Sequence, residues 1–196
     1  MSESDAPPIS KLRELWATVL SWFDNESGVS SLHGDEERID WLRTLPFILM
    51  HLGCVGIFFF GFSWSAVALA IVLYLIRMFA ITAFYHRYFS HRAFKTSRTL
   101  QFLFALIGAC SIQRSPIWWA AHHRHHHAHS DAPDDTHSPV QKGFFWSHMV
   151  WFLCRQNYTT RKHLIRDWMK FPELVFLDRY DTLVPALFGV AIYGLG

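Results

Sequence analysis

The sequence predicts an all-α integral membrane protein: a helical bundle, incomplete at its C-terminus, with a histidine-rich cap on the cytoplasmic side. Hydrophobic residues make up 51% of the 196 residues and aromatic residues 17%, which is high for a soluble chain of this length. Two apolar stretches are long enough to cross a bilayer. After them, the segment "WWAAHHRHHHAHSDAPDDTH" at 118–137 holds seven histidines in twenty residues.

Residues 1–40 are predicted to form an N-terminal cytoplasmic segment with one amphipathic helix. No signal peptide starts it, because Glu3 and Asp5 precede any apolar core. Ser10 can cap a helix whose apolar side chains recur at helical spacing. These side chains are Leu12, Leu15, Trp16, Val19, Leu20 and Phe23. The stripe suits the membrane surface and the protein's own surface equally, and we expect no chemistry from it.

A helical hairpin follows at the start of a domain predicted over residues 41–196. Residues 45–62 (LPFILMHLGCVGIFFFGF) carry no charge, and residues 65–85 (SAVALAIVLYLIRMFAITAFY) contain only Arg77, for which we expect a structural role. A spanning helix needs roughly 20 such residues, and backbone groups in lipid must be satisfied within the helix. Only Ser63 and Trp64 separate the stretches, so both outer ends lie on one side of the membrane.

Basic residues flank the outer ends of this hairpin, whereas its turn is uncharged. They are Arg38 and Arg43 before the first span, and Arg87, Arg92, Lys95 and Arg98 after the second. The positive-inside rule places these ends, and the histidine tract with them, in the cytoplasm. We expect the inner membrane of a bacterium, or the endoplasmic reticulum if the source is a eukaryote.

The remaining apolar stretches are shorter than a span. The cytoplasmic part is expected to extend over residues 86–182. The apolar run at 100–112 is expected to lie at the membrane interface or to pack under this part, and the same two alternatives hold for the run at 144–154. Residues 183–196 look like the start of a third span. We therefore expect the chain to be a fragment or a truncated product.

Charge and cysteine content exclude some classes of protein. The net charge is only +2, and no basic patch stands apart from the membrane flanks, so a nucleic-acid partner is not expected. Cys54, Cys110 and Cys154 follow no paired spacing, which predicts buried thiols rather than disulfides or a zinc site.

The histidine spacing on a helix allows two alternative ligand faces. At about 100° per residue, His123, His126 and His127 share one narrow sector. A second sector holds His122, His125, His126 and His129. Neutral imidazole binds iron, zinc or copper, and spacing alone does not choose between the two faces.

A further histidine pair, "HRYFSH" at 86–91, lies at the cytoplasmic end of the second predicted span. On an ideal α-helix His86 and His91 would point about 140° apart, so they would not easily chelate one ion. They could instead serve two ions held between this helix end and the helix that carries His123.

Four segments resemble, in order and spacing, the membrane fatty-acyl desaturases of the stearoyl-CoA delta-9 type, most of all the bacterial members. They are "HRYFSHRAF" at 86–94, "HRHHH" at 123–127, "SDAPDDTHS" at 130–138 and "GFFWSHMVW" at 143–151. The resemblance covers roughly residues 40–196. It implies a di-iron centre held by histidine boxes, with dioxygen as co-substrate, that introduces a cis double bond into a saturated acyl chain.

The resemblance also assigns roles to individual residues. The metal ligands would be His86, His91, His123, His126 and His127, which selects the first of the two faces. Gln113 and Trp119 would line the bend of the acyl tunnel. Residues that support the ligands by hydrogen bonds would be His122, His125, Asp131 and His137.

The chain departs from the family at its end. A third box of the H-x-x-H-H type, with a nearby Asn and His, is expected after two further spans, and the chain stops first. Five ligands are too few for two irons. We therefore expect this polypeptide alone to bind iron weakly and to be inactive, while the intact parent is a desaturase.

The implied partners are a fatty-acyl substrate, with acyl-CoA favoured, and a separate electron donor, because no haem or flavin module is fused. The donor would be a ferredoxin, or cytochrome b5 with its reductase. A histidine-box hydroxylase acting on alkanes or lipids is the nearest alternative. A metal transporter is disfavoured, because it would need polar ligands along its spans, and we expect only His51 and Arg77 to supply them.

Overall fold

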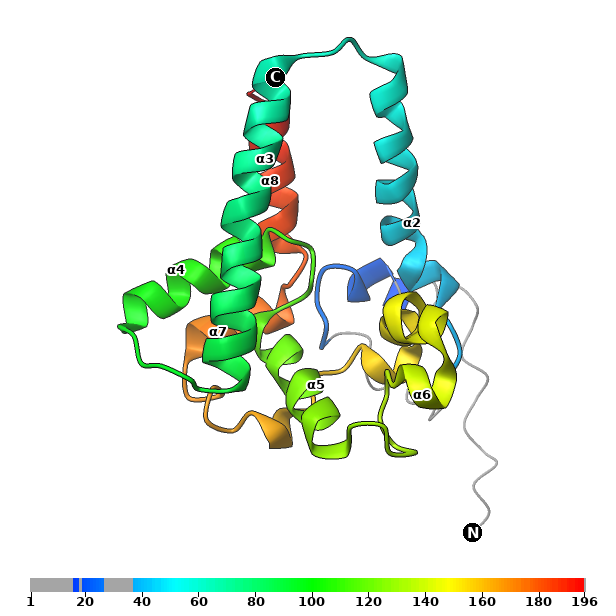
Figure 1. Cartoon of the computed structure of the whole chain (residues 1–196), viewed down its shortest axis with the longest axis vertical. Helices are drawn as coiled ribbons and strands as arrows, with labels where there is room; N and C mark the ends of the chain where they lie inside the picture. The colour runs from blue at the N-terminus through cyan, green and yellow to red at the C-terminus, as the bar shows by residue number, and fades with distance from the viewer. Residues whose placement is uncertain (1–15, 18, 27–36, 196) are drawn as a thin grey trace.

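The computed structural model describes residues 16–17, 19–26 and 37–195. All regular elements within these ranges are helices, and the only β contact among them is an isolated bridge between Ile39 and Cys154. A tall hairpin and one shorter helix rise from a layer of short helices (Figure 1). The predicted all-α class is confirmed.

The first arm of the hairpin is α2 (Trp41–Val55), which continues as the 3-10 turn η1 (Gly56–Phe59). It begins four residues before the predicted span, because the Asp40 carboxylate caps it by accepting the backbone N–H of Arg43 at 3.1 Å. The whole stretch Trp41–Phe59 is apolar enough to cross a membrane, and only 6% of its most apolar window is buried. Its side chains therefore face outward, as lipid contact requires.

The second arm is α3 (Trp64–Phe79), which runs without a break into the π-helix η2 (Ala80–Ser90). Ser63 caps its start by accepting the N–H of Ala66. The continuous helix Trp64–Ser90 is the second candidate span, with 17% of its window buried, and it extends five residues past the predicted end at 85. It therefore carries the first histidine of the 86–91 pair inside the helix.

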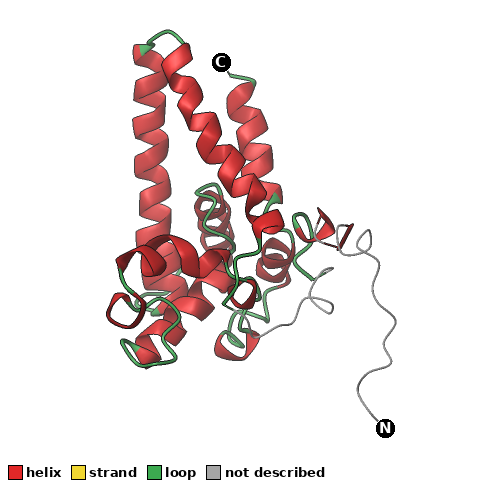
Figure 2. Ribbon diagram, turned by 90° about the vertical axis from the view of Figure 1, so that its right-hand side faces the viewer, coloured by secondary structure: helices red, strands yellow, loops and turns green. Residues whose placement is uncertain are grey.

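Arg77 has a structural environment within this arm. Its Nε donates to the carbonyl of Leu73 at 3.0 Å, and its Nη1 donates to the carbonyl of Cys110 at 3.4 Å. The guanidinium also lies 5.8 Å from the ring of Phe188 in α8 (Leu183–Tyr193). This helix rises from the helical layer toward the turn of the hairpin (Figures 1 and 2).

The core lies below the hairpin, where η2 packs against α4 (Arg98–Ala109) and α5 (Pro116–His129), and α7 (Pro172–Arg179) packs against both of these helices. Its largest fully buried side chains include Tyr85, Phe89, Ile117, Ile165 and Leu174. Gly108 of α4 meets the Tyr85 ring so closely that a Cβ there would overlap it. This packing holds the histidine-bearing ends of η2 and α5 against each other.

Short helices complete the layer, and most of the run at 144–154 lies in two of them, η3 (Trp146–Val150) and η4 (Trp151–Leu153). The others are α6 (Pro139–Lys142), η5 (Arg155–Asn157) and η6 (Lys162–Leu164). The run at 100–112 forms α4, which is too short to span, as predicted.

Two smaller predictions need comment. All three cysteines are free, but only Cys154 is buried; Cys54 is exposed because it lies on the outward surface of α2, so the expectation of buried thiols was wrong for it. The predicted N-terminal helix lies partly outside the described residues. In its described part Trp16, Leu20 and Phe23 are exposed.

Candidate metal centre

The π pitch of η2 brings His86 and His91 together. The backbone N–H of His91 donates to the carbonyl of His86 at 3.2 Å, a bond across five residues. Such a turn places residue i+5 next to residue i, on the same face of the helix. The two Nε2 atoms are 3.1 Å apart. The expectation that this pair would diverge by 140° was wrong, because it assumed α-helical geometry.

Side chains from other elements satisfy the carbonyl groups where η2 ends. Arg124 donates from Nε to the carbonyl of Ser90 at 2.9 Å and from Nη2 to that of Phe89 at 2.7 Å. The indole of Trp168 also donates to the Phe89 carbonyl at 2.7 Å. A helix end that is buried needs such donors. These bonds stabilise the π-helical end and connect it to α5.

Asp167 balances the charge of Arg124. Its two carboxylate oxygens lie 2.8 and 3.0 Å from the Arg124 guanidinium in a bidentate pair, and Arg92 adds a contact of 2.7 Å. Burial raises the pKa of Asp167, but the bonds from Arg124 and the charge of Arg92 outweigh it and leave that pKa below its usual value. Sequence reasoning missed both residues, although a single arginine inside a histidine tract was a visible signal.

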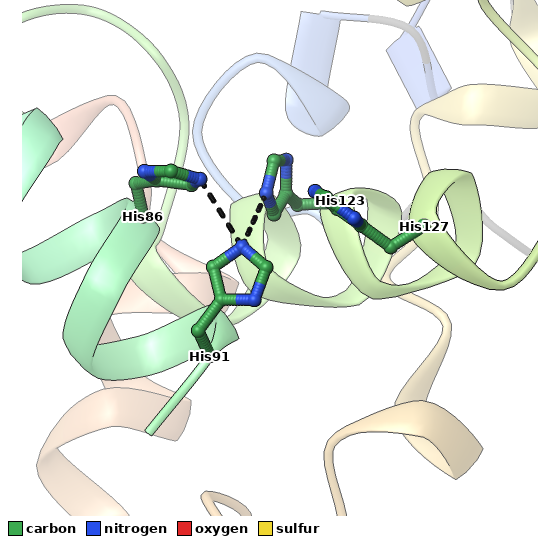
Figure 3. A group of neighbouring side chains, drawn as sticks. All are labelled: His86, His91, His123 and His127. Carbon is green, nitrogen blue, oxygen red and sulfur yellow. Dashed lines mark hydrogen bonds between the residues drawn. The ribbon is translucent and has the colours of Figure 1, made fainter. Parts of the chain in front are cut away.

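Four histidines converge where η2 meets α5 (Figure 3). The Nε2 of His123 lies 3.0 Å from that of His91, and the His127 ring centroid is 4.5 Å from that of His123. One nitrogen from each of His86, His91, His123 and His127 lies within 4.8 Å of all the others. We call these residues the four-histidine group.

The chemistry of this donor set suits a metal cation. An imidazole nitrogen carries either one proton or one lone pair, so Nε2 of His91 can make only one of its two close contacts a hydrogen bond. A cation at the centre would accept the lone pairs of all four rings. The group therefore fits a transition-metal ion better than it fits a network of hydrogen bonds.

Two of the four rings, His91 and His123, are also held in the protonation state that binds metal. Burial, with the neighbouring His127 and His86, lowers the pKa of His123 from 6.5 to about 3. The pKa of His91 is lowered too, first by burial. Both imidazoles are neutral at pH 7, the form in which they ligate.

His126 lies in a separate, neighbouring group. Its Nδ1 is 2.9 and 3.0 Å from the two oxygens of Asp135, and its ring stacks on His137 with centroids 4.2 Å apart. Donation from Nδ1–H to the carboxylate leaves the Nε2 lone pair free for a metal, as in many metal sites. The His126 and His127 ring centroids are 5.7 Å apart, so the two groups adjoin.

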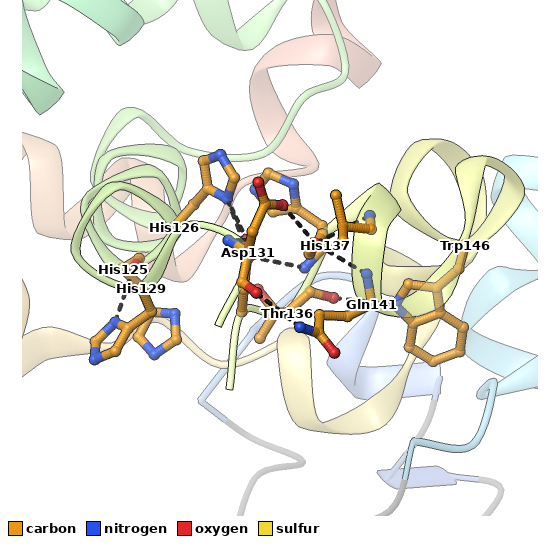
Figure 4. A network of polar contacts seen from close by, with 11 residues as sticks. His125, His126, His129, Asp131, Thr136, His137, Gln141 and Trp146 are labelled. Carbon is orange, nitrogen blue, oxygen red and sulfur yellow. Dashed lines mark hydrogen bonds and ion pairs between the residues drawn. The ribbon is translucent and has the colours of Figure 1, made fainter. Parts of the chain in front are cut away.

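Asp135, rather than Asp131, supports a histidine. Asp135 is fully buried and accepts backbone N–H groups of Asp131 and His137 at 3.0 and 3.2 Å. Burial raises the pKa of Asp135, but these bonds and the one from His126 outweigh it and lower the pKa. The Asp131 carboxylate accepts the hydroxyl of Ser138 instead (Figure 4). The expected contact of Asp131 with a ligand was wrong, because the turn after α5 directs its side chain toward residue 138.

Of the other residues expected to support the ligands, one contacts a candidate ligand and two belong to neither group. His137 packs on His126 as described, whereas His122 and His125 belong to neither group. His122 is buried between Trp118 and Trp151, with ring centroids 4.4 and 5.6 Å away. Burial, with a smaller contribution from the charge of Arg161, lowers the pKa of His122 to about 3.

Gln113 and Trp119 lie together beside the four-histidine group. The Trp119 indole donates to Oε1 of Gln113 at 3.3 Å, and its ring stacks on His123 with centroids 4.7 Å apart. It is also 6.1 Å from the His86 ring. An aromatic surface therefore flanks the histidines where the second span meets α5.

Comparisons with known proteins agree with this arrangement. The profile of the family described as fatty acid desaturase matches residues 62–196. An sn-2 palmitoyl-lipid 9-desaturase of Nostoc sp. (strain 36) is 34% identical over 178 residues, which cover 88% of this chain and 62% of the relative. An sn-1 stearoyl-lipid 9-desaturase of Anabaena variabilis is 35% identical, over 81% of this chain and 59% of the relative.

A delta-9 acyl-lipid desaturase 1 of Arabidopsis thaliana is 36% identical over 82% of this chain and 53% of its own length. The chain thus spans between half and two thirds of the length of these relatives. The profile match covers well over half of the 196 residues and includes every histidine of the four-histidine group. The chain belongs to the fatty acid desaturase family.

Proposed function

We propose that this chain forms part of an oxygen-dependent desaturase that introduces a cis double bond into a saturated fatty-acyl chain. The observation that carries the proposal is the convergence of four imidazoles at the end of a membrane-spanning helix. The names of the related proteins support the same reaction class. We place the protein in a membrane, with the histidines on the cytoplasmic side, and favour the bacterial inner membrane.

We propose two iron ions as the resident metal. The four-histidine group would hold one ion, and His126, oriented by Asp135, would provide a ligand to the other. When bound, the irons and dioxygen supply the oxidising power that removes two hydrogens from an unactivated acyl chain. Five histidines are few donors for two ions, so we expect the 196-residue chain alone to hold iron weakly.

The chain's own residues would position the substrate and exclude water. The four-histidine group lies where a helix leaves the apolar part of the hairpin, so an acyl chain can approach it from the membrane side. The Trp119 ring, stacked on His123 and hydrogen-bonded to Gln113, would form part of an apolar wall beside the reacting carbons. A wall of this kind keeps water from the metals.

The acyl carrier and the electron donor are further parts of the proposal. Three of the related proteins are named for lipid-linked substrates, and we therefore propose a lipid-linked acyl chain in place of the acyl-CoA favoured from sequence. Electrons would come from a separate protein, a ferredoxin or cytochrome b5.

The test is expression of the gene from which this chain derives in a bacterial host without a desaturase, followed by mass spectrometry of its fatty acids. We expect monounsaturated chains, found first in membrane lipids, and their loss in His123→Ala. The control His163→Ala changes an exposed histidine outside all the groups and should keep the activity. A hydroxylated product, or an unchanged fatty-acid profile, would contradict the proposal.

A further inference from the structure

A third group of potential ligands lies on α5 and the turn that follows it. His125 and His129 are separated by four residues, so one helix turn places their rings side by side, with centroids 4.4 Å apart and planes 27° apart (Figure 4). The Asp134 carboxylate reaches back from the turn. One donor atom from each of the three residues lies within 4.8 Å of the others.

Hydrogen bonding selects the tautomer of His129. Its Nδ1 lies 3.0 Å from the carbonyl oxygen of His125, which can only accept, so Nδ1 carries the proton. In the neutral ring, Nε2 then holds a lone pair. That lone pair faces Oδ2 of Asp134 at 3.3 Å, so two electron-rich atoms point at one another. A cation held between these two atoms would turn their repulsion into attraction.

The distance between His129 Nε2 and Asp134 Oδ2 suits a cation. Ligands bound to one tetrahedral zinc ion at about 2.0–2.1 Å lie roughly 3.3–3.4 Å apart, which matches the separation of Nε2 and Oδ2. The alternative is an ion pair with protonated His129. The two side chains are 39% and 59% exposed, and a surface pair of this kind contributes little stability.

We propose that His125, His129 and Asp134 form a zinc site, separate from the proposed iron centre. Two imidazoles and one carboxylate are a ligand set that Zn²⁺ takes up with water in its fourth position. The partial exposure of His129 and Asp134 leaves room for this water and for entry of the ion.

Such a site would have a structural consequence. The ion would connect α5 to the turn at 130–135, and this turn also carries Asp135, the hydrogen-bond partner of His126. Zinc would thereby restrain the turn that orients His126. The inference does not depend on the proposed reaction, because it concerns only the binding of Zn²⁺ to these three side chains.

The test is a zinc titration of the purified chain in detergent after removal of metal with EDTA, read with a chromophoric zinc competitor. The comparison includes His129→Gln, Asp134→Asn and the control His163→Gln. We expect His129→Gln to bind one zinc fewer per chain than wild type. Asp134→Asn should lower the affinity for that zinc ion by roughly tenfold or more, because removing a group that only hydrogen-bonds to a ligand already has an effect of this size. His163→Gln should match wild type.

Thermal unfolding provides a second measurement. Zinc should raise the unfolding temperature of the wild type and of His163→Gln by more than that of His129→Gln, because a ligand stabilises only the state that binds it. Asp134→Asn changes an exposed side chain and should fold normally, so it keeps the test valid if His129→Gln does not fold. Equal zinc stoichiometry and affinity in all four proteins would overturn the proposal.

Discussion

The two helices that supply the four-histidine group differ in pitch. On α5, His123 and His127 are four residues apart and align along an ordinary α-helix. At the end of η2, His86 and the capping residue His91 are five residues apart and align only because the helix has π geometry. The same convergence of nitrogens is therefore reached by two spacings, so histidine spacing identifies a shared face only when the local helix type is known.

The elements also differ in what stabilises them. The start of α5 is capped by Ser115, which accepts the N–H of Trp118 at 2.9 Å. The end of η2 depends on donors from elsewhere, namely Arg124 and Trp168. An α-helix with a cap is locally encoded, whereas this π-helical end needs tertiary contacts.

The largest effect is expected from Arg124→Ala, which would break the connection between the two helices. It removes the Arg124 donors to the carbonyls of Phe89 and Ser90. Among the described residues, Asp167 then keeps Arg92 as its ionic partner. Loss of one member of a buried ion pair costs about 3–5 kcal/mol when the other charge is left without a partner, and because Arg92 still contacts Asp167 we expect the low end of this range. Thermal unfolding in detergent should show a strongly destabilised protein.

Arg124→Lys is the matched control, because it keeps the charge but not the forked geometry. The unfolding temperature of Arg124→Lys should lie between those of wild type and Arg124→Ala. Equal stability of Arg124→Ala and wild type would show that the π-helical end does not need this residue.

A smaller effect is expected from Gly108→Ala, which acts on the η2 side alone. The added Cβ would overlap the Tyr85 ring and force η2 and α4 apart, and overpacking of this kind costs about 1–3 kcal/mol. The unfolding temperature should fall. Gly189→Ala in α8 has nothing within 4 Å of its new Cβ and should change little. Equal effects of the two substitutions would argue that Tyr85 does not fix the position of η2.

The smallest effect concerns α5 alone and depends on pH. The folded pKa of His122, about 3, is below its ordinary 6.5, so the unfolded chain binds the extra proton first as pH falls. The contribution of His122 to the free energy of unfolding is therefore fully present above pH 6.5 and is lost progressively as pH falls toward 3. Between pH 7 and 5.5 the loss is about 1 kcal/mol.

His122→Phe keeps an aromatic ring between Trp118 and Trp151 but cannot take up a proton. Its unfolding temperature should fall less than that of wild type between pH 7 and 5.5. The exposed control His163→Phe should follow the wild type. If His122→Phe is as acid-sensitive as wild type, another group is responsible for the acid sensitivity.

The helical hairpin was predictable because its signal is local. Composition alone marks both spans, and the structure changes only their ends, through the Asp40 cap and the π continuation to Ser90. The correct grouping of the histidines was less accessible. The 140° estimate for His86 and His91 failed because the helix pitch cannot be read from their spacing. Asp131 was expected to support a ligand, whereas Asp135 does so, because the path of the turn is not visible in the sequence.

The sequence by itself determined which parts of the chain are apolar enough for lipid and which residues carry imidazoles, since both depend only on residue type and order. The tertiary structure alone decided how the histidines are grouped. Four form the four-histidine group, His126 pairs with Asp135, and His125 and His129 lie beside Asp134. The physical reason is that this division depends on the pitch of η2 and on the path of the turn after α5. Both are set by contacts between residues far apart in the chain, such as those of Arg124 with Phe89 and Asp167.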